Sequence, residues 1–267
     1  MIKSDIGLVG LAVMGENLAL NLEQKGYRVS LYNRLRENSP QAVDSFLANK
    51  GKNKHFIGTH SPKEFIESLK SPRKILLMIR AGHPVDEMIT TLLPFLKKGD
   101  TIIDGGNSDY RDTQRRENEL REKGIFFVGC GISGGEEGAL HGPSIMPGGS
   151  DEIKKEILPV LQNIAAHLDD ETPCCSWIGP AGSGHFVKTV HNGIEYGDMQ
   201  LIAEAYSLLN VLQKGDHEAT AQTFESWNKG VLDSYLIGIT APILRYKDTD
   251  GKSLIDKIAD RAGQKGT

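Results

Sequence analysis

Short apolar runs alternate with longer amphipathic stretches over the first half of the chain. The runs are rich in β-branched residues, as buried strands are, and the stretches between them repeat their apolar positions every three or four residues, as helices do. Strands joined by helices in this order form a parallel sheet. The expected strands are Ile6–Val9, Val29–Tyr32, Phe56–Ile57, Ile75–Ile79, Thr101–Ile103 and Ile125–Val128, and the expected helices span about 15–25, 40–50, 61–69, 84–96 and 110–123.

Proline and glycine mark the boundaries between these elements. Pro40, Pro62 and Pro84 each stand at the start of a helical pattern, where the missing amide proton leaves no hydrogen bond unmade. Glycine is so frequent from Gly129 to Gly149 that we do not expect regular structure over the whole segment, and we interpret it as a loop or as active-site backbone. A helix near 151–167 and a short strand at Ser176–Ile178 are expected to follow.

The pattern becomes entirely helical from Gly184 onward. Strand-like alternation is lost, and apolar positions recur at helical spacing. We therefore expect an α/β domain with a doubly wound, Rossmann-type sheet at residues 1–180, followed at 181–267 by the first helices of an all-α domain. The helices expected in the second domain span about 184–212, 216–229, 231–245 and 253–261.

Composition and charge exclude several classes of protein. The 267 residues are 39% hydrophobic and 25% charged, as in globular domains, and the net charge of −4 offers no basic footprint for nucleic acid or an acidic membrane. No apolar run reaches the ~18 residues of a membrane helix, and no signal peptide precedes the first strand. The three cysteines form neither a disulfide framework nor a metal-binding pair. We expect a soluble, cytoplasmic protein that binds no nucleic acid, membrane or metal.

A glycine-rich turn follows the first strand and leads into a helix. In this context the turn is typical of a dinucleotide site, where the pyrophosphate lies on the helix N-terminus. The alternative is an ordinary tight turn between a strand and a helix. The motif reads GxAxxG, with alanine at the position of the usual second glycine, and comprises Gly10, Leu11, Ala12, Val13, Met14 and Gly15.

The end of the second strand favours NADP over NAD. An NAD enzyme places an acidic residue there to bind the ribose, about 20 residues beyond the glycine motif. This chain has Asn33 followed by Arg34, which leaves room and a positive charge for a 2′-phosphate. The alternative is that Arg34 only caps a surface turn.

Polar side chains line one face of the long helix expected at about 184–212. They stand at positions i, i+3, i+4 and i+7, occupied by Lys188, His191, Asn192 and Glu195. The adjacent face is expected to pack in a core through Val187, Val190, Ile194 and Leu201. A solvated, salt-bridged surface is the alternative for the polar face, but the neutral His191 and Asn192 favour contact with a substrate. Lys188 and Glu195 are then candidates for a base and an acid.

Two glycine-rich segments are further candidates for the site. Gly131–Gly135 supplies the Ser133 hydroxyl and accessible backbone amides, which suit an anion, although a flexible crossover is the alternative. Asp104–Ser108 follows the fifth strand at the carboxyl edge of the sheet, where ligands bind in open α/β folds. Asn107 is expected to reach both nicotinamide and substrate.

Four longer segments add to these motifs, namely Asp104–Asp112, Ile132–Ala139, His191–Gln200 and Ala262–Thr267. With them the chain resembles the 6-phosphogluconate dehydrogenase family of the β-hydroxyacid dehydrogenase group, from residue 4 to the last residue. The resemblance implies an oxidoreductase of the pentose phosphate pathway and gluconate utilization, a homodimer that converts 6-phosphogluconate and NADP to ribulose 5-phosphate, CO2 and NADPH.

The resemblance also assigns roles to single residues. It implies that Lys188 is the general base for the 3-hydroxyl proton and that Glu195 is the acid that protonates C1 after CO2 has left. The substrate would be held by Asn107, Ser133, Gly134, Gly135, His191 and Asn192, with its phosphate at Tyr196, Lys265 and Thr267. The cofactor would be held by Gly10 to Gly15, Asn33, Arg34, Leu35, Ile79, Arg80, Ala81 and Asn107.

The chain departs from the family pattern in two places. Leu35 stands where the family usually has threonine, which removes one hydroxyl from the 2′-phosphate site. Family members also continue beyond Thr267 with more helices and a C-terminal tail. We therefore expect a truncated form whose helices after residue 212 expose apolar faces, with a substrate site that lacks the family's later residues.

Two other functions stay open from the sequence. One is a related β-hydroxyacid dehydrogenase for a smaller acid without a phosphate, for which Tyr196 and Lys265 would have nothing to bind. The other is an NADP-binding module without turnover.

Overall fold

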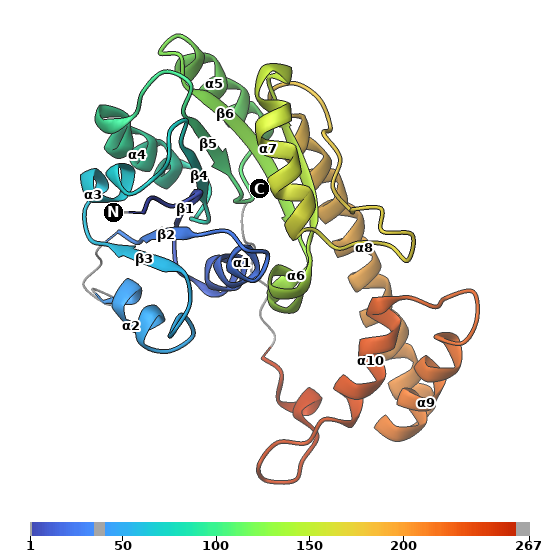
Figure 1. Cartoon of the computed structure of the whole chain (residues 1–267). Coiled ribbons are helices and arrows are strands. Elements are labelled where there is room, and N and C mark those ends of the chain that lie inside the picture. Colours follow the sequence, from blue (N-terminus) through green and yellow to red (C-terminus); the bar gives the residue numbers. More distant parts are fainter. Residues whose placement is uncertain (1, 35–40, 260–267) are drawn as a thin grey trace. The chain divides into compact units, whose positions relative to one another are not determined.

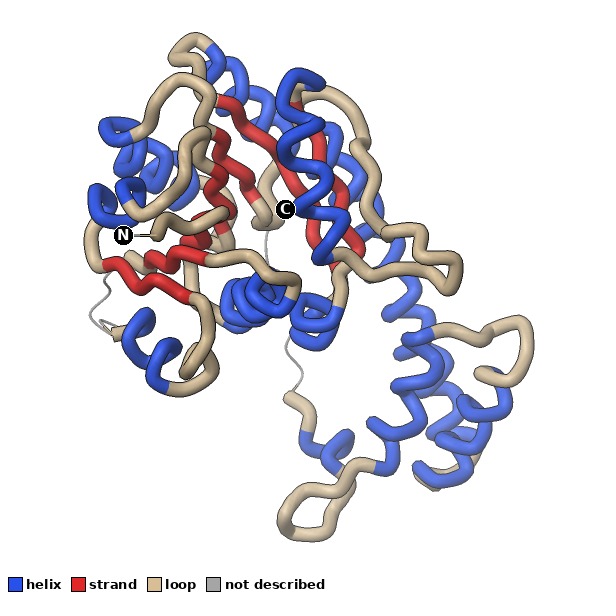
Figure 2. The backbone as a smooth tube through the Cα atoms, in the orientation of Figure 1, coloured by secondary structure: helices blue, strands red, loops and turns tan. Residues whose placement is uncertain are grey.

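The computed structural model describes residues 2–34 and 41–259. Contacts divide the chain into two compact units, and the division falls between Val190 and His191, inside one long helix. Figure 2 shows strands in the first unit, whereas the described part of the second unit contains helices and loops alone. No described helix is both long and apolar enough to cross a membrane.

The first unit is built on one seven-stranded sheet (Figure 1). Its strand order is β3-β2-β1-β4-β5-β6-β7; all neighbours pair in parallel except β6 and β7, which pair antiparallel. The six strands expected in the first half are therefore confirmed, with β7 added at the edge. The strands are β1 Ile6–Val9, β2 Val29–Tyr32, β3 Phe56–Thr59, β4 Lys74–Leu77, β5 Thr101–Asp104, β6 Phe126–Ser133 and β7 Ser144–Gly149.

Helices cover both faces of this sheet, as in a doubly wound fold. Short polar side chains start three of them: Ser61, Asp109 and Ser150 each accept a hydrogen bond from a backbone N–H of the following first turn. The helices are α1 Val13–Gln24, α2 Ala42–Ala48, α3 Pro62–Glu67, α4 His83–Leu92, α5 Tyr110–Arg121, α6 Gly135–His141 and α7 Asp151–Ile164, with a 3-10 turn η1 at Leu93–Phe95.

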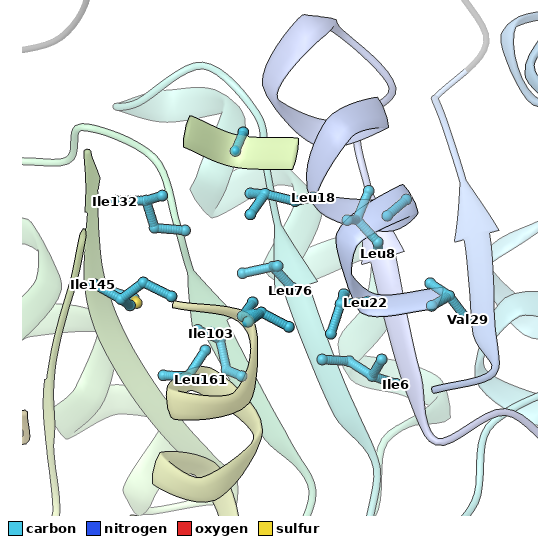
Figure 3. Close-up of a cluster of buried hydrophobic side chains, with 14 of the residues drawn as sticks. Ile6, Leu8, Leu18, Leu22, Val29, Leu76, Ile103, Ile132, Ile145 and Leu161 are labelled. Carbon is cyan, nitrogen blue, oxygen red and sulfur yellow. The ribbon is translucent and has the colours of Figure 1, made fainter. Parts of the chain in front are cut away.

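Two separate apolar cores hold the helices to the sheet. On one face, Leu18 and Leu22 of α1 and Leu161 of α7 pack with Leu76 and Ile103 of the central strands (Figure 3). On the other face, side chains of α3, α4 and α5 pack with the alternate residues of the same strands. Since successive residues of a strand point to opposite faces, strands buried on both sides are apolar throughout.

The segment from Gly129 to Gly149 is more regular than the sequence indicated. It contains the second half of β6, helix α6 and strand β7. Most of its glycines stand where another backbone or side chain approaches too closely for a Cβ atom, although Gly135 and Gly138 do not. A Cβ on Gly131 would lie 2.5 Å from the Cβ of Lys188, and one on Gly148 would lie 2.6 Å from the backbone nitrogen of Gly184. Regular strands thus persist because glycine makes room for a helix.

Three other expectations also change. Ser176–Ile178 is no strand, because only the flanking Cys175 and Gly179 form isolated bridges to β7. The helix expected at about 231–245 begins at Tyr235, since the Ser234 hydroxyl caps it. The one expected at about 253–261 is the short 3-10 turn η2, Leu254–Lys257. The helix start expected at Pro40 lies outside the described residues.

The second unit contains the larger part of helix α8 (Ser183–Leu212), α9 (His217–Trp227) and α10 (Tyr235–Arg245). Phe224 and Leu244 are buried in its small core, against which Ile202 and Leu209 of α8 pack. Large apolar side chains outside this core are exposed, among them Val231. The expectation that the helices after residue 212 expose apolar faces is met on α10, through Tyr235 and Ile243, but no large apolar side chain of α9 is exposed.

The first turn of α8 lies directly on the sheet of the first unit. A Cβ on Gly184 would lie 2.3 Å from the carbonyl oxygen of Met146 and 2.4 Å from that of Gly129. A side chain at this position would therefore push the helix away from β6 and β7. This contact fixes where α8 begins, and it therefore fixes the position of Lys188, one turn later, relative to β6.

We expect Gly184→Ala to lower the free energy of unfolding by about 1–3 kcal/mol, because the added methyl group overpacks a rigid backbone contact. Gly197→Ala is the matched control, since nothing lies within 4 Å of a Cβ at that position of the same helix. Alanine should leave stability equal or higher there. Denaturant unfolding measures both. Equal stability of Gly184→Ala and the parent chain would contradict the contact.

A buried arginine joins α5 to α4. Arg116 is 1% exposed, and its Nε and Nη2 each donate to a different carboxylate oxygen of Asp86 at 2.9 Å. The hydrogen bond from Arg116 lowers the pKa of Asp86 to about 2, with a further contribution from Arg115. The Asp104 carboxylate lies 3.7 Å from the remaining nitrogen of Arg116.

This pair predicts a pH dependence of stability. Because the pKa of Asp86 is lower in the folded chain than in the unfolded chain, its contribution is complete above about pH 4 and is lost as the pH falls towards 2. Asp86→Asn should therefore lower the melting temperature most at pH 6 and progressively less towards pH 2. Asp198→Asn, on an exposed part of α8, is the control. A pH-independent effect of Asp86→Asn would rule out the ion pair.

Candidate functional site

The carboxyl ends of β1, β4 and β5 meet where the strand order of the sheet reverses. β1 pairs with β2 on one side and with β4 on the other, so the chain leaves β1 in one direction and returns on its opposite side. In open α/β sheets a ligand binds at such a switch point. The segments that follow these three strands therefore define the candidate site of the first unit.

The turn after β1 requires glycine at both ends of its motif. Gly10 has φ +101°, and a Cβ there would lie 2.3 Å from the carbonyl oxygen of Met78. A Cβ on Gly15 would lie 1.9 Å from the carbonyl oxygen of Gly10. The backbone is thus folded tightly against the start of α1. Ala12 occupies the N-cap position and its side chain makes no capping bond, so the first amides of α1 have no side-chain acceptor and suit an anionic ligand.

Asn33 ties the second strand to this turn. Its Oδ1 accepts a hydrogen bond of 3.0 Å from the backbone nitrogen of Leu11. Arg34, predicted to bind a 2′-phosphate, is half-exposed and its Nη1 lies 2.6 Å from Oε2 of Glu87 on α4. The structure therefore gives Arg34 an acidic partner that the sequence motif does not indicate. Leu35 lies outside the described residues.

The segment Ile79–Ala81 links β4 to the region before α4 and adjoins the glycine turn. The side chain of Ile79 would lie 2.9 Å from a Cβ on Gly10. Its carbonyl oxygen would lie 3.0 Å from a Cβ on Gly106. Ile79 therefore stands between the turn after β1 and the turn after β5, which brings two predicted parts of the cofactor site together.

Asp104 shapes the turn that carries Asn107. One oxygen of its buried carboxylate accepts a hydrogen bond from the backbone nitrogen of Gly106 at 3.1 Å, and the other accepts one from the Ser108 hydroxyl at 2.7 Å. Asn107 is held between these two bonds and is half-buried. The sequence indicated the segment Asp104–Ser108 and gave a role to Asn107, but it gave none to Asp104, which positions Asn107.

Lys188 lies against the same sheet edge. Its side chain is 6% exposed, and a Cβ on Gly131 would lie 2.5 Å from its Cβ and 3.1 Å from its Cγ. Ser133 ends β6 two residues further along, and Gly134 and Gly135 start α6 with φ of +146° and +61°. The predicted loop is therefore a strand end followed by a helix start, and Lys188 lies beside it.

His185 is a buried residue that sequence reasoning missed. It is 1% exposed, and its Nδ1 lies 2.7 Å from the Thr113 hydroxyl of α5. Burial lowers the pKa of the ring, so His185 is neutral at pH 7. A histidine one turn before Lys188 on the same helix was the available signal. Its contact fastens the start of α8 to α5.

The remaining polar residues of α8 belong to the second unit. Nδ1 of His191 lies 3.2 Å from Oδ1 of Asn192 and 3.7 Å from Oε2 of Glu195. Tyr196 is 55% exposed. The helix places these side chains at the predicted intervals, and the structure links three of them by polar contacts. Lys265 and Thr267, predicted to bind the substrate phosphate, lie outside the described residues.

The apolar face of α8 corrects a sequence expectation. Val190, Ile194 and Leu201 were expected in a core, but they are 47%, 62% and 66% exposed. The helix instead packs on α9 and α10 through Ile202 and Leu209, which point to another side of it. An apolar stripe shows which face of a helix is suited to burial, but it does not show which element packs on that face.

No group of three possible metal ligands occurs among the described residues.

Two family models match the chain. Residues 5–179 match the NAD binding domain of 6-phosphogluconate dehydrogenase, and residues 184–267 match the 6-phosphogluconate dehydrogenase, C-terminal domain. A decarboxylating 6-phosphogluconate dehydrogenase of Candida albicans is 56% identical over 99% of this chain and 50% of its own length. The human enzyme of the same description is 55% identical over 100% of this chain and 54% of its own length.

A solved structure of similar fold comes from Plasmodium falciparum. It is 6-phosphogluconate dehydrogenase, studied as the apo form and in complex with NADP+ and with 6-phosphogluconate; it aligns with a TM-score of 0.88 and 45% identity, over 98% of this chain and 56% of that one. The chain thus spans about half the length of the relatives it matches. It belongs to the 6-phosphogluconate dehydrogenase family.

Proposed function

We propose that this chain takes part in the NADP-dependent oxidative decarboxylation of 6-phosphogluconate to ribulose 5-phosphate and CO2. In this function it supplies the cofactor domain and the first helices of the all-α domain. The family membership and the ligands of the Plasmodium falciparum relative support this substrate and cofactor. One observation carries the proposal: buried Lys188 lies on Gly131, at the sheet edge where the dinucleotide turn and Asn107 also lie.

The residues at the switch point fit a dinucleotide. The tight turn at Gly10–Gly15 starts α1 directly after β1, and the first amides of α1 have no side-chain cap, so a pyrophosphate can accept hydrogen bonds from them. The other residues proposed to hold the cofactor are Asn33, Arg34, Leu35, Ile79, Arg80, Ala81 and Asn107. When bound, NADP supplies the hydride acceptor for oxidation at C3.

Lys188 is proposed to serve both chemical steps. As the base it takes the proton of the 3-hydroxyl while the hydride leaves C3. The product is a β-keto acid, and the protonated Lys188 then polarises its C3 carbonyl, which accepts the electron pair released when the bond to CO2 breaks. No metal is needed, because the keto group itself is the electron sink.

Glu195 is proposed to finish the reaction by protonating C1 of the enediol. His191 and Asn192, which contact one another, are proposed to bind the substrate with Asn107 and Ser133–Gly135. Tyr196, Lys265 and Thr267 are proposed for its phosphate. A phosphate distinguishes this substrate from the smaller acids of related β-hydroxyacid dehydrogenases, since it gives Tyr196 and Lys265 a partner.

A homodimer and a cytoplasmic location are also proposed for this function. Both follow from the resemblance to the family.

We expect NADP to bind more tightly than NAD and Arg34→Ala to remove most of that difference. A charge-assisted contact to phosphate is worth roughly 1.5–3 kcal/mol, which is about tenfold or more in affinity. The missing hydroxyl at Leu35 favours the lower end of this range. Calorimetric titration with both dinucleotides measures the difference in affinity between NADP and NAD. Equal losses for NADP and NAD would show that Arg34 serves the fold instead of the 2′-phosphate.

The reaction itself is tested by following NADPH absorbance with 6-phosphogluconate. The assay uses the chain as given and the chain extended with the C-terminal half of the Candida albicans relative. We expect Lys188→Met in the extended chain to lower the rate by at least about 10²-fold without weakening NADP binding. Glu195→Gln should slow proton delivery from solvent to C1 more than hydride transfer, as hydrogen isotope exchange into the product reports.

Two outcomes would contradict this account. Normal proton delivery to C1 in Glu195→Gln would leave Glu195 with only a structural role. Tight NADP binding without NADPH formation, even in the extended chain, would favour a dinucleotide-binding module without turnover.

A further inference from the structure

Arg34, the residue proposed to bind the 2′-phosphate of NADP, forms an ion pair with Glu87. Its Nη1 lies 2.6 Å from Oε2 of Glu87, on the first turns of α4. The second oxygen of Glu87 lies 3.3 Å from Nδ1 of His83, one turn earlier on the same helix. The hydrogen bond from Arg34 lowers the pKa of Glu87, so its carboxylate is charged at neutral pH.

The ion pair lies in a shallow, open pocket of about 400 Å³. The pocket is lined by Arg34, His83, Asp86, Glu87, Thr90 and Thr91. Arg34 directly follows Asn33 after the end of β2, so the pocket adjoins the carboxyl edge of the sheet. It is therefore within the first unit and next to the dinucleotide turn.

The two acidic residues of the pocket differ in their partners. Asp86 forms ion pairs with buried Arg116 and with Arg115, both on α5. These two arginines balance its charge, and neither of them lines the pocket. The arginine that contacts Glu87 is Arg34, which stands on the cofactor side. Asp86 thus stabilises the packing of α4 on α5, whereas Glu87 forms an ion pair with Arg34, the residue proposed to bind the 2′-phosphate.

We propose that Glu87 is a specificity-determining residue of the cofactor site, because it occupies the Arg34 guanidinium and must release it before a 2′-phosphate binds. The inference rests on the proposed binding of NADP. A 2′-phosphate exchanges one anionic partner of Arg34 for another, so NADP binding includes the cost of breaking the pair. NAD has no group that needs Arg34, and its binding leaves the pair intact.

The size of this effect follows from the exposure of the pair. The side chains of Arg34 and Glu87 are 53% and 38% exposed, and exposed ion pairs contribute little because water screens them. A phosphate with more charge and more acceptor oxygens replaces such a carboxylate readily. His83 then remains as a partner for the released Glu87. We therefore expect Glu87 to weaken NADP binding only roughly two- to tenfold.

Glu87→Gln tests the proposal in the chain as it stands. Calorimetric titration should show NADP binding roughly two- to tenfold tighter and NAD binding unchanged. Glu67→Gln is the matched control, because it removes the same charge from an exposed position of neighbouring α3 and should change neither affinity. Circular dichroism checks that both variants are folded. An unchanged ratio of NADP to NAD affinity in Glu87→Gln would overturn the proposal.

A double-mutant cycle separates competition from simple repulsion. If Glu87 acts by holding Arg34, then Glu87→Gln should have no further effect on NADP affinity in an Arg34→Ala chain. An equal gain in NADP affinity in the parent and Arg34→Ala chains would show direct repulsion between Glu87 and the phosphate. That result would overturn the proposal that Glu87 competes for Arg34. Failure of the parent chain to bind either dinucleotide overturns the proposed function and this inference together, whereas NADP binding with no effect of Glu87→Gln overturns the inference alone.

Discussion

The contact between bare backbones at the switch point of the sheet is the constraint on which the rest depends. Gly15 and Gly10 leave no room for a Cβ, because the carbonyl oxygens of Gly10 and Met78 already occupy those positions. Helix α1 can therefore begin right at the end of β1, with its first amides uncapped by a side chain. A larger residue at either glycine would collide with these carbonyl oxygens and separate the helix from the sheet, which would displace the amides that an anion can approach.

A second contact of the same kind places the catalytic candidate. Gly184 lets the first turn of α8 lie on the carbonyl oxygens of Gly129 and Met146, and Gly131 lets the stem of Lys188 lie on β6. His185 fastens that turn to α5 through Thr113. Backbone contacts on one side of the helix therefore hold the stem of Lys188 against β6.

Local patterns predicted the strands of the sheet, because residues buried on both faces are apolar whatever their neighbours are. They failed where a long-range contact decides the structure. The glycines from Gly129 to Gly149 look like a loop until the helix that packs on them is known, and Ser176–Ile178 makes too few backbone hydrogen bonds with β7 to form a regular strand. The same holds in the site: the motif indicates Asn33 and Arg34, but only the fold brings Glu87 to Arg34 and Asn33 to Leu11. The sequence also shows the apolar stripe at Val190 and Ile194, but a local pattern does not determine whether another element packs on it, and both side chains are exposed in the structure.

Hydrogen–deuterium exchange with and without NADP tests the central claim most directly, because it reports on individual backbone amides. The claim is that the glycine-built turn and the first turn of α1 accept the pyrophosphate. NADP should slow exchange in peptides covering Gly10–Asn17 and Ile79–Ala81, and leave α9 and α10 unchanged. Unchanged exchange of the Gly10–Asn17 amides at saturating NADP would contradict the account, since a pyrophosphate that accepts hydrogen bonds from these amides must protect them.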